Sequence, residues 1–181
     1  MLLAGLLLKL GSYGFLRFTI IMFADACTFY APIIFIIAIL SILYPILTAF
    51  SQTDLKRIIA YSSISHMNFV VLGIFSFTHQ GLDGSIYLML AHGIVSVALF
   101  FCVGVLYDRY HTRSIKHYSG LVQVMPLFCI FLFLFTLANM SFPGTSNFVG
   151  ELLILAGVFN ANSFVMVVMA SGIVGSAVYS I

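Results

Sequence analysis

The sequence predicts an all-α integral membrane protein, a bundle of about six transmembrane helices whose fifth member is broken. Of its 181 residues, 62% are hydrophobic and 7% are charged, whereas a soluble domain carries about 25% charged residues. Seven Lys and Arg and five Asp and Glu cannot cover the surface of a soluble 19.9 kDa globule. The apolar residues also fall into runs of about 17–25, the length that crosses a hydrocarbon core. A soluble monomer is therefore excluded.

The expected helices follow one another with short polar connections. The apolar runs are 2–18, 32–50, 58–77, 85–107, 121–159 and 163–181, and the connections are 19–31, 51–57, 78–84, 108–120 and 160–162. Because no linker interrupts this order, we expect one membrane domain over residues 1–181.

The fifth run is too long for one straight crossing and too short for two. Its middle contains Pro143, which lacks an N–H group, and Gly144, which permits backbone angles that a helix forbids. We therefore predict two half-helices joined by unwound backbone, a device that transporters use at ion sites. A surface or re-entrant turn is the simpler alternative.

Basic residues predict the orientation. If the crossings alternate, loops 51–57 and 108–120 share one face and hold five of the seven Lys and Arg, whereas Arg17 lies on the opposite face. The positive-inside rule places the five-residue face in the cytoplasm or matrix.

Four ionisable residues fall inside the predicted helices instead of in loops. Counted from the nearest polar helix end at 1.5 Å per residue, each lies roughly 12–14 Å deep in a core of about 30 Å. They are Lys9, His66, His92 and Glu151. A charge at this depth costs at least about 2.5–3.5 kcal/mol, so such residues are candidates for ion paths and proton relays.

Each of these residues also has a simpler interpretation. Lys9 could extend to the interface, the two histidines could be hydrogen-bonded packing residues, and Glu151 could bond the freed backbone of the break. Their matched depth favours a shared role. Smaller polar residues extend the set on the same helix faces or at the break, namely Ser12, Tyr13, Ser62, Ser63, Ser96, Asn139, Ser141, Thr145, Ser146 and Asn147.

Three classes of function compete at this point. A proton or cation path uses all four residues. A cytochrome b-like carrier, with His66 and His92 on a haem, leaves Lys9 and Glu151 unexplained. If the chain were a passive helical scaffold, the matched depth of the four ionisable residues would be a coincidence. Cys27, Cys102 and Cys129 lack metal-site spacing, and no Walker or dinucleotide motif is present.

Several segments closely resemble one family over essentially the whole chain. They are Leu2-Leu-Ala-Gly-Leu-Leu-Leu-Lys-Leu-Gly-Ser-Tyr-Gly14, Gln52-Thr-Asp-Leu-Lys-Arg-Ile-Ile-Ala-Tyr-Ser-Ser63, Ser65-His-Met67, Leu90-Ala-His-Gly93, Leu106-Tyr-Asp-Arg109 and Phe142-Pro-Gly-Thr-Ser-Asn-Phe-Val-Gly-Glu151. These strings resemble the subunit 4 family of the proton-pumping NADH:ubiquinone oxidoreductase, respiratory complex I, whose bacterial counterpart is chain M. Subunits 2 and 5 and the Mrp antiporter subunits match less well.

The resemblance implies an antiporter-like, inverted-repeat fold in which this chain is the central-to-C-terminal part of a longer subunit. By motif, Lys9 is similar to the central channel lysine, His66 and His92 to the connecting histidines, and Glu151 to the acidic residue of the second broken helix. The implied function is proton translocation in the membrane arm, in the mitochondrial inner membrane or, alternatively, a bacterial plasma membrane. A stand-alone or Mrp-type cation/proton antiporter is the alternative.

The resemblance also implies which cofactors other subunits bind and which subunits are the partners of this chain. FMN, iron–sulfur clusters and ubiquinone are expected in other subunits, and the partners are the neighbouring membrane-arm subunits. We expect no cofactor, metal, NADH or nucleic-acid site in this chain. The family's upstream glutamate and broken-helix lysine precede Met1, so we expect this chain not to pump by itself.

Overall fold

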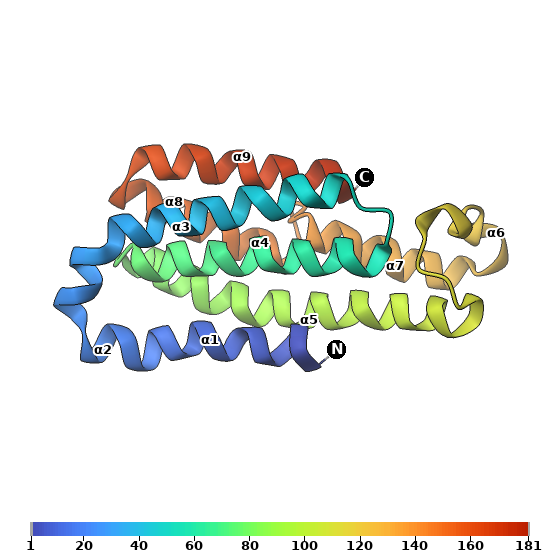
Figure 1. Ribbon diagram of the computed structural model, residues 1–181, viewed down its shortest axis with the longest axis horizontal. Helices are drawn as coiled ribbons and strands as arrows, with labels where there is room; N and C mark the ends of the chain where they lie inside the picture. Colours follow the sequence, from blue (N-terminus) through green and yellow to red (C-terminus); the bar gives the residue numbers. More distant parts are fainter. Residues whose placement is uncertain (1, 181) are drawn as a thin grey trace.

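The computed structural model describes residues 2–180 as a bundle of helices that run along one common axis (Figure 1). Within these residues, five helical spans are long and apolar enough to cross a membrane, which confirms the expected all-α membrane fold. In chain order the elements are η1 (Leu3–Leu7), α1 (Leu8–Gly14), η2 (Phe15–Thr19), α2 (Ile20–Met22), α3 (Ala24–Phe50), α4 (Leu55–Phe75), α5 (His79–Tyr110), η3 (Ile115–Tyr118), α6 (Leu121–Val124), α7 (Pro126–Asn139), α8 (Ser146–Ala161) and α9 (Ser163–Ser180).

The connection expected at 19–31 is helical apart from one residue. The first span, η1 to α2, continues to Met22, and α3 begins at Ala24, so Phe23 alone makes the turn. Polar residues suggested a loop here, but the Thr28 hydroxyl donates a hydrogen bond of 2.8 Å to the Asp25 carbonyl of its own helix. Local bonding of this kind lets a polar residue remain in a membrane helix. The helix expected from residue 32 thus begins eight residues earlier.

Two further connections are shorter than expected. Helix α5 begins at His79 instead of residue 85, because the Thr78 hydroxyl caps it by accepting a hydrogen bond of 3.1 Å from the Gly81 N–H. Helix α8 continues to Ala161, and the side-chain oxygen of Asn162 accepts a hydrogen bond from the Phe164 N–H as α9 begins. In both places a polar side chain starts a helix where composition suggested a loop.

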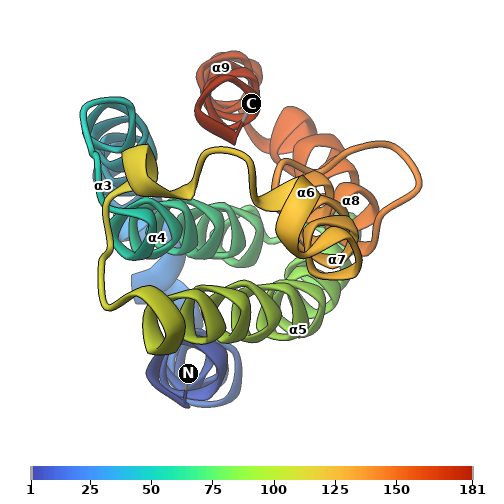
Figure 2. The same cartoon turned by 90° about the vertical axis from the view of Figure 1, so that its right-hand side faces the viewer.

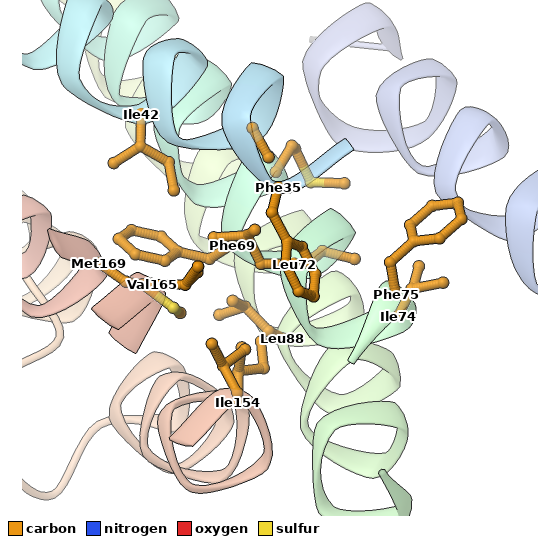
Figure 3. Close-up of a cluster of buried hydrophobic side chains, with 14 of the residues drawn as sticks. Phe35, Ile42, Phe69, Leu72, Ile74, Phe75, Leu88, Ile154, Val165 and Met169 are labelled. Carbon is orange, nitrogen blue, oxygen red and sulfur yellow. The ribbon is translucent and has the colours of Figure 1, made fainter. Parts of the chain in front are cut away.

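Helix α4 lies at the centre of the bundle and contributes more buried residues to the main hydrophobic core than any other helix. It packs between α3 and α5 (Figure 2). Phe69 and Leu72 of α4 are completely buried, and they meet side chains of the surrounding helices, among them Leu88 of α5, Ile154 of α8 and Met169 of α9 (Figure 3). Residues on α4 are consequently shielded from lipid along most of its length.

Glycines bring α5 and α8 into the most extensive helix contact of the bundle. A Cβ atom on Gly157 would lie 2.5 Å from the backbone nitrogen of Gly81, and one on Gly84 would lie 2.8 Å from the backbone nitrogen of Ile154. Membrane helices approach this closely where small residues line their interface. The close approach fixes α8 against α5 and therefore fixes the position of Glu151.

The predicted break in the fifth run is confirmed. Helices α7 and α8 lie one after the other along the long axis (Figure 1). Their 14 and 16 residues correspond to about 21 and 24 Å, so neither crosses a core of about 30 Å alone. Between them Ser141 has a φ of 56° and Gly144 a φ of 99°. A second interruption, at Met125 before Pro126, was not expected and leaves α6 as a separate short helix.

The two basic loops lie together at one end of the bundle, as their alternation predicted. The Leu55 N–H donates to the Arg113 carbonyl at 3.2 Å, and the Ile115 N–H donates to the Thr53 carbonyl at 3.1 Å. Figure 2 views this end, where the segment that follows α5 crosses over the helices. The structure thus gathers five of the seven Lys and Arg at one end.

We predict that Gly157→Ala destabilises the fold by about 1–3 kcal/mol, because the new methyl group would be forced into the backbone of α5. Gly11→Ala is the matched control, since a Cβ atom there meets no atom within 4 Å. The measurement is the unfolding transition of the detergent-solubilised protein, followed by the loss of helical circular dichroism. Equal stability of the two variants would contradict the proposed α5–α8 contact.

Candidate functional site

The four ionisable residues that depth singled out form one row across the bundle. The Lys9 Nζ atom lies 3.1 Å from Nδ1 of His92. The rings of His92 and His66 face each other with centroids 5.3 Å apart. Nδ1 of His66 lies 2.8 Å from the Glu151 carboxyl. Residues that are up to 142 positions apart in the chain are therefore brought into a single sequence of contacts.

Four different helical elements position this row. Lys9 comes from α1, His92 from α5, His66 from α4 and Glu151 from α8. Both histidines are completely buried, and Glu151 is 2% exposed. Lys9 is half-buried, and its long side chain reaches inward from a helix that is mostly exposed. The row is thus enclosed at its centre and at the Glu151 end.

The hydrogen-bond partners assign a tautomer to each histidine. A Lys9 ammonium can only donate, so Nδ1 of His92 accepts and its Nε2 carries the proton. A Glu151 carboxylate can only accept, so Nδ1 of His66 donates and its Nε2 holds a lone pair. The Nε2 atoms of both rings are buried without a hydrogen-bond partner among residues 2–180. One is then a donor and the other an acceptor, which are complementary roles.

The row is neutral as a whole when Lys9 and Glu151 are charged and both histidines are neutral. Opposite charges at its two ends compensate each other, which reduces the cost of burying them. The same net charge results when a proton lies on either histidine and Lys9 is neutral. Several arrangements of the proton thus share one net charge, which is the electrostatic condition for a relay.

The helix that carries Lys9 departs from α-helical geometry. The segments before and after α1, namely η1 and η2, are π-helical. In addition to His92, the Lys9 ammonium donates to the carbonyl of Ala4, five residues earlier. π-helical turns occur frequently at functional sites. Here the carbonyl of Ala4, which belongs to the π-helical segment η1, holds the lysine beside His92.

The sequence matches one family over almost its whole length. Residues 1–177 match the family model described as the NADH:quinone oxidoreductase/Mrp antiporter transmembrane family. The chain belongs to this family. It is 57% identical over 180 residues to "NADH-ubiquinone oxidoreductase chain 4" of Chondrus crispus, covering 99% of this chain and 37% of the relative. The chain therefore spans a little over one third of the length of that curated relative.

Solved structures give the same result for the fold. Respiratory complex I from Thermus thermophilus contains a chain that is 34% identical, with a TM-score of 0.91 over 95% of this chain and 37% of that chain. The Mrp complex from Dietzia sp. DQ12-45-1b contains a chain that is 24% identical, with a TM-score of 0.81 over 86% of this chain and 29% of that chain. The second similarity shows the fold alone.

Most of the supporting polar residues of this family member bond to their own backbone. Ser12 donates to the carbonyl of Lys9, Ser62 and Ser63 both donate to that of Ile59, and Ser96 donates to that of Gly93. Tyr13 lines the same apolar groove as Lys9, but its side chain is 54% exposed. These contacts shape the helices around the row and do not extend it.

The broken helix gathers unpartnered polar atoms beside Glu151. Thr145 donates to the Phe142 carbonyl and so stabilises the turn that contains Pro143 and Gly144. The hydroxyl of Ser141 and both amide atoms of Asn147 are buried without a partner in the described chain. Asn147 lies one turn before Glu151 on α8 and shares its face. Buried polar atoms of this kind are commonly satisfied by water.

One polar residue near the row, Tyr179 of α9, was not found by sequence reasoning. Tyr179 lines a cavity of about 240 Å³ together with Ser62 and Asn139. Its hydroxyl is buried and has no direct hydrogen-bond partner among the residues that the structure describes. A single tyrosine in the apolar run of α9, three residues after Ser176, was the only available signal. Its proximity to α4 depends on how α9 packs.

Residues 2–180 contain no group of three or more His, Cys, Asp or Glu side chains that could hold a metal ion. Each histidine of the row already uses one ring nitrogen, with Lys9 or with Glu151.

We predict that His66 and Glu151 stabilise the fold cooperatively. Either His66→Leu or Glu151→Leu leaves an uncompensated polar group in the core and should cost about 3–5 kcal/mol, whereas the double substitution should cost much less than the sum. The exposed pair Arg57–Asp54, at 3.4 Å, is the control, and its cycle should give at most about 1 kcal/mol. Denaturant titration in detergent measures both cycles, and additive effects at His66 and Glu151 would contradict their direct bond.

Proposed function

We propose that this chain is a proton-translocating part of subunit 4 in the membrane arm of an NADH:ubiquinone oxidoreductase. The observation that carries the proposal is the row Lys9–His92–His66–Glu151, built from four helices in a membrane bundle. The chain's membership of the antiporter-like family and its identity to a curated chain 4 support it.

A proton can pass along the row by exchange at the two nitrogens of each ring. Lys9 gives a proton to Nδ1 of His92, which becomes an imidazolium and releases the proton on its Nε2 atom. Nε2 of His66 receives that proton, directly after a ring movement or through water, and His66 then gives its Nδ1 proton to Glu151. Each ring accepts at one nitrogen and donates at the other, so both end in the opposite tautomer. Return of the tautomers completes the cycle.

The energy for this transfer comes from redox chemistry outside this chain. We propose that this chain has no NADH, flavin, iron–sulfur or quinone site of its own, and that FMN, the clusters and ubiquinone are bound by other subunits. Its partners are then the neighbouring antiporter-like subunits of the membrane arm. The half-buried Lys9 lies at the open side of the row, where the rest of the complex can act on it.

We place the protein in the mitochondrial inner membrane as one multi-pass domain over residues 1–181, with loops 51–57 and 108–120 on the matrix side. A eukaryotic relative supports the mitochondrial location. Five of the seven Lys and Arg in the two joined loops support the orientation, because basic loops are retained on the matrix or cytoplasmic side. A bacterial plasma membrane is the alternative.

An Mrp-type antiporter is the second candidate, favoured by its shared fold. The two candidates differ in their assemblies. We predict that peptides of this chain comigrate with a large NADH-oxidising complex on a native gel of mildly solubilised membranes, detected by activity stain and mass spectrometry. Migration in a smaller complex without NADH-oxidising activity would favour the antiporter.

We predict that Lys9→Ala and Glu151→Gln each lower proton transport by about tenfold or more, because a positioned proton-transfer group typically contributes at least 10²-fold. Transport is measured as NADH-driven acidification in sealed vesicles that contain the assembled complex. Lys116→Ala, on an exposed loop, is the control and should retain transport. Normal transport in both Lys9→Ala and Glu151→Gln would exclude the row as the proton path.

A further inference from the structure

The first helical span approaches α5 at Gly5, a buried glycine of η1. A Cβ atom on Gly5 would lie 2.3 Å from Cγ2 of Val97, far inside van der Waals contact. The next nearest atoms to this position are Cβ of Val97 at 3.8 Å and the Gly93 carbonyl oxygen at 3.9 Å. One methyl group of Val97 is thus the main obstacle to a larger residue at position 5. It does not turn aside easily, because a β-branched side chain in a helix strongly prefers one rotamer.

The same close approach determines where Lys9 lies. Its ammonium donates to the carbonyl of Ala4, the residue before Gly5, and lies 3.1 Å from Nδ1 of His92. On α5, His92 is followed by Gly93. A Cβ atom on Gly93 would lie 3.5 Å from the Gly5 carbonyl oxygen and 3.8 Å from Cε of Lys9, which are ordinary contact distances. The ammonium therefore lies between an acceptor on η1 and an acceptor on α5, at the point where these two elements meet.

Relief of a clash at Gly5 would have to separate η1 from α5. Two carbon atoms pack at about 3.5–4.0 Å, so a Cβ atom on Gly5 would need more than about 1 Å of additional separation from Val97. The same displacement would lengthen the contact between Lys9 and His92 from 3.1 Å to about 4 Å, beyond hydrogen-bond range. The lysine side chain cannot simply follow His92, because its ammonium also donates to Ala4, which moves with η1.

We propose that Gly5 is a positioning residue for proton transfer. Because it has no side chain, Val97 of α5 comes into contact with η1, and this contact holds the Lys9 ammonium against Nδ1 of His92. The inference rests on the proposed proton-translocating function and adds to it a residue that carries no proton itself. A displaced ammonium would interrupt the row at Lys9, whereas α4, α5 and α8 would keep the other three members in place.

The first test compares Gly5→Ala, Val97→Ala and the double variant in sealed vesicles that contain the assembled complex. The measurement is the initial rate of NADH-driven acidification per amount of complex on a native gel. We expect Gly5→Ala to lower this rate roughly tenfold, as a barrier higher by about 1.4 kcal/mol does. The double variant should recover most of the rate, because the new methyl group then meets its nearest remaining neighbours at 3.8 Å or more. Gly93→Ala, whose Cβ atom fits on the facing helix, is the matched control and should retain transport.

Unchanged transport in Gly5→Ala would overturn the inference, and so would a loss that Val97→Ala does not restore. If Gly5→Ala prevents assembly, the double variant decides. Recovery of both the complex and its transport rate would support the role of Gly5, and failure to recover either would overturn it.

The second test asks whether Gly5 acts through Lys9. Gly5→Ala is combined with Lys9→Ala, and the residual transport rate of Lys9→Ala alone is the reference. We expect the double variant to transport at this reference rate, because no ammonium remains to be misplaced. A general distortion of the bundle would lower the rate again, since it would also disturb the contact between His66 and Glu151. A further fall as large as the one that Gly5→Ala causes by itself would overturn the positioning role.

The two proposals fail in different ways. If Lys9→Ala lowers transport while Gly5→Ala does not, the proposed function stands and the positioning role of Gly5 is wrong. If Lys9→Ala and Glu151→Gln both transport normally, the row is not the proton path, and the positioning role of Gly5 fails with it.

Discussion

A lysine and a carboxylate at the depth of the hydrocarbon core have to be compensated by neighbouring groups, and the arrangement of the central helices meets this constraint. Glu151 is almost completely buried, and its bond to His66 is its only direct hydrogen bond to a side chain in the described part of the protein. That bond requires α8 to lie beside α4 at a fixed position along the long axis of the bundle. Lys9 makes the corresponding bond to His92 and so ties the first helical span to α5. The two ends of the row then balance each other in charge.

The glycines of α5 and α8 provide the geometry that this compensation needs. Gly81 and Gly84 allow the backbones to approach until any added methyl group would clash. Without hydrophobic driving force between helices in lipid, such close packing is a main source of association. Packing at Gly157 and electrostatics at Glu151 therefore act on the same helix. Because the chain is not helical between α7 and α8, the direction of α8 does not depend on that of α7.

The gap in the row lies between the two histidine rings, and it separates the charged ends. The rings are 5.3 Å apart, and each has a buried, unpartnered Nε2 atom. The two nitrogens have complementary donor and acceptor roles, so a small ring movement or a water completes the connection. In the proposed proton path, a row without a gap would let protons leak continuously, whereas a row with one adjustable gap could be controlled by ring orientation. The half-buried position of Lys9 would leave it within reach of the proposed neighbouring subunits.

The apolar pattern and the depth of four ionisable residues were sufficient to predict the membrane fold, the broken fifth helix and the members of the row. Lipid demands long apolar helices and makes every buried charge conspicuous, so these features can be found one helix at a time. The order within the row and the positions of Ala4 beside Lys9 and of Tyr179 beside Ser62 depended on which helices pack together. The stretch 19–31 was wrongly predicted to be a loop. The hydroxyl of Thr28 instead donates to the Asp25 carbonyl within α3 itself. By itself, the sequence determined which residues the membrane forces to find partners. Only the tertiary structure decided which residues those partners are. Contacts between helices far apart in the chain depend on how closely their backbones can approach at glycines such as Gly81 and Gly157.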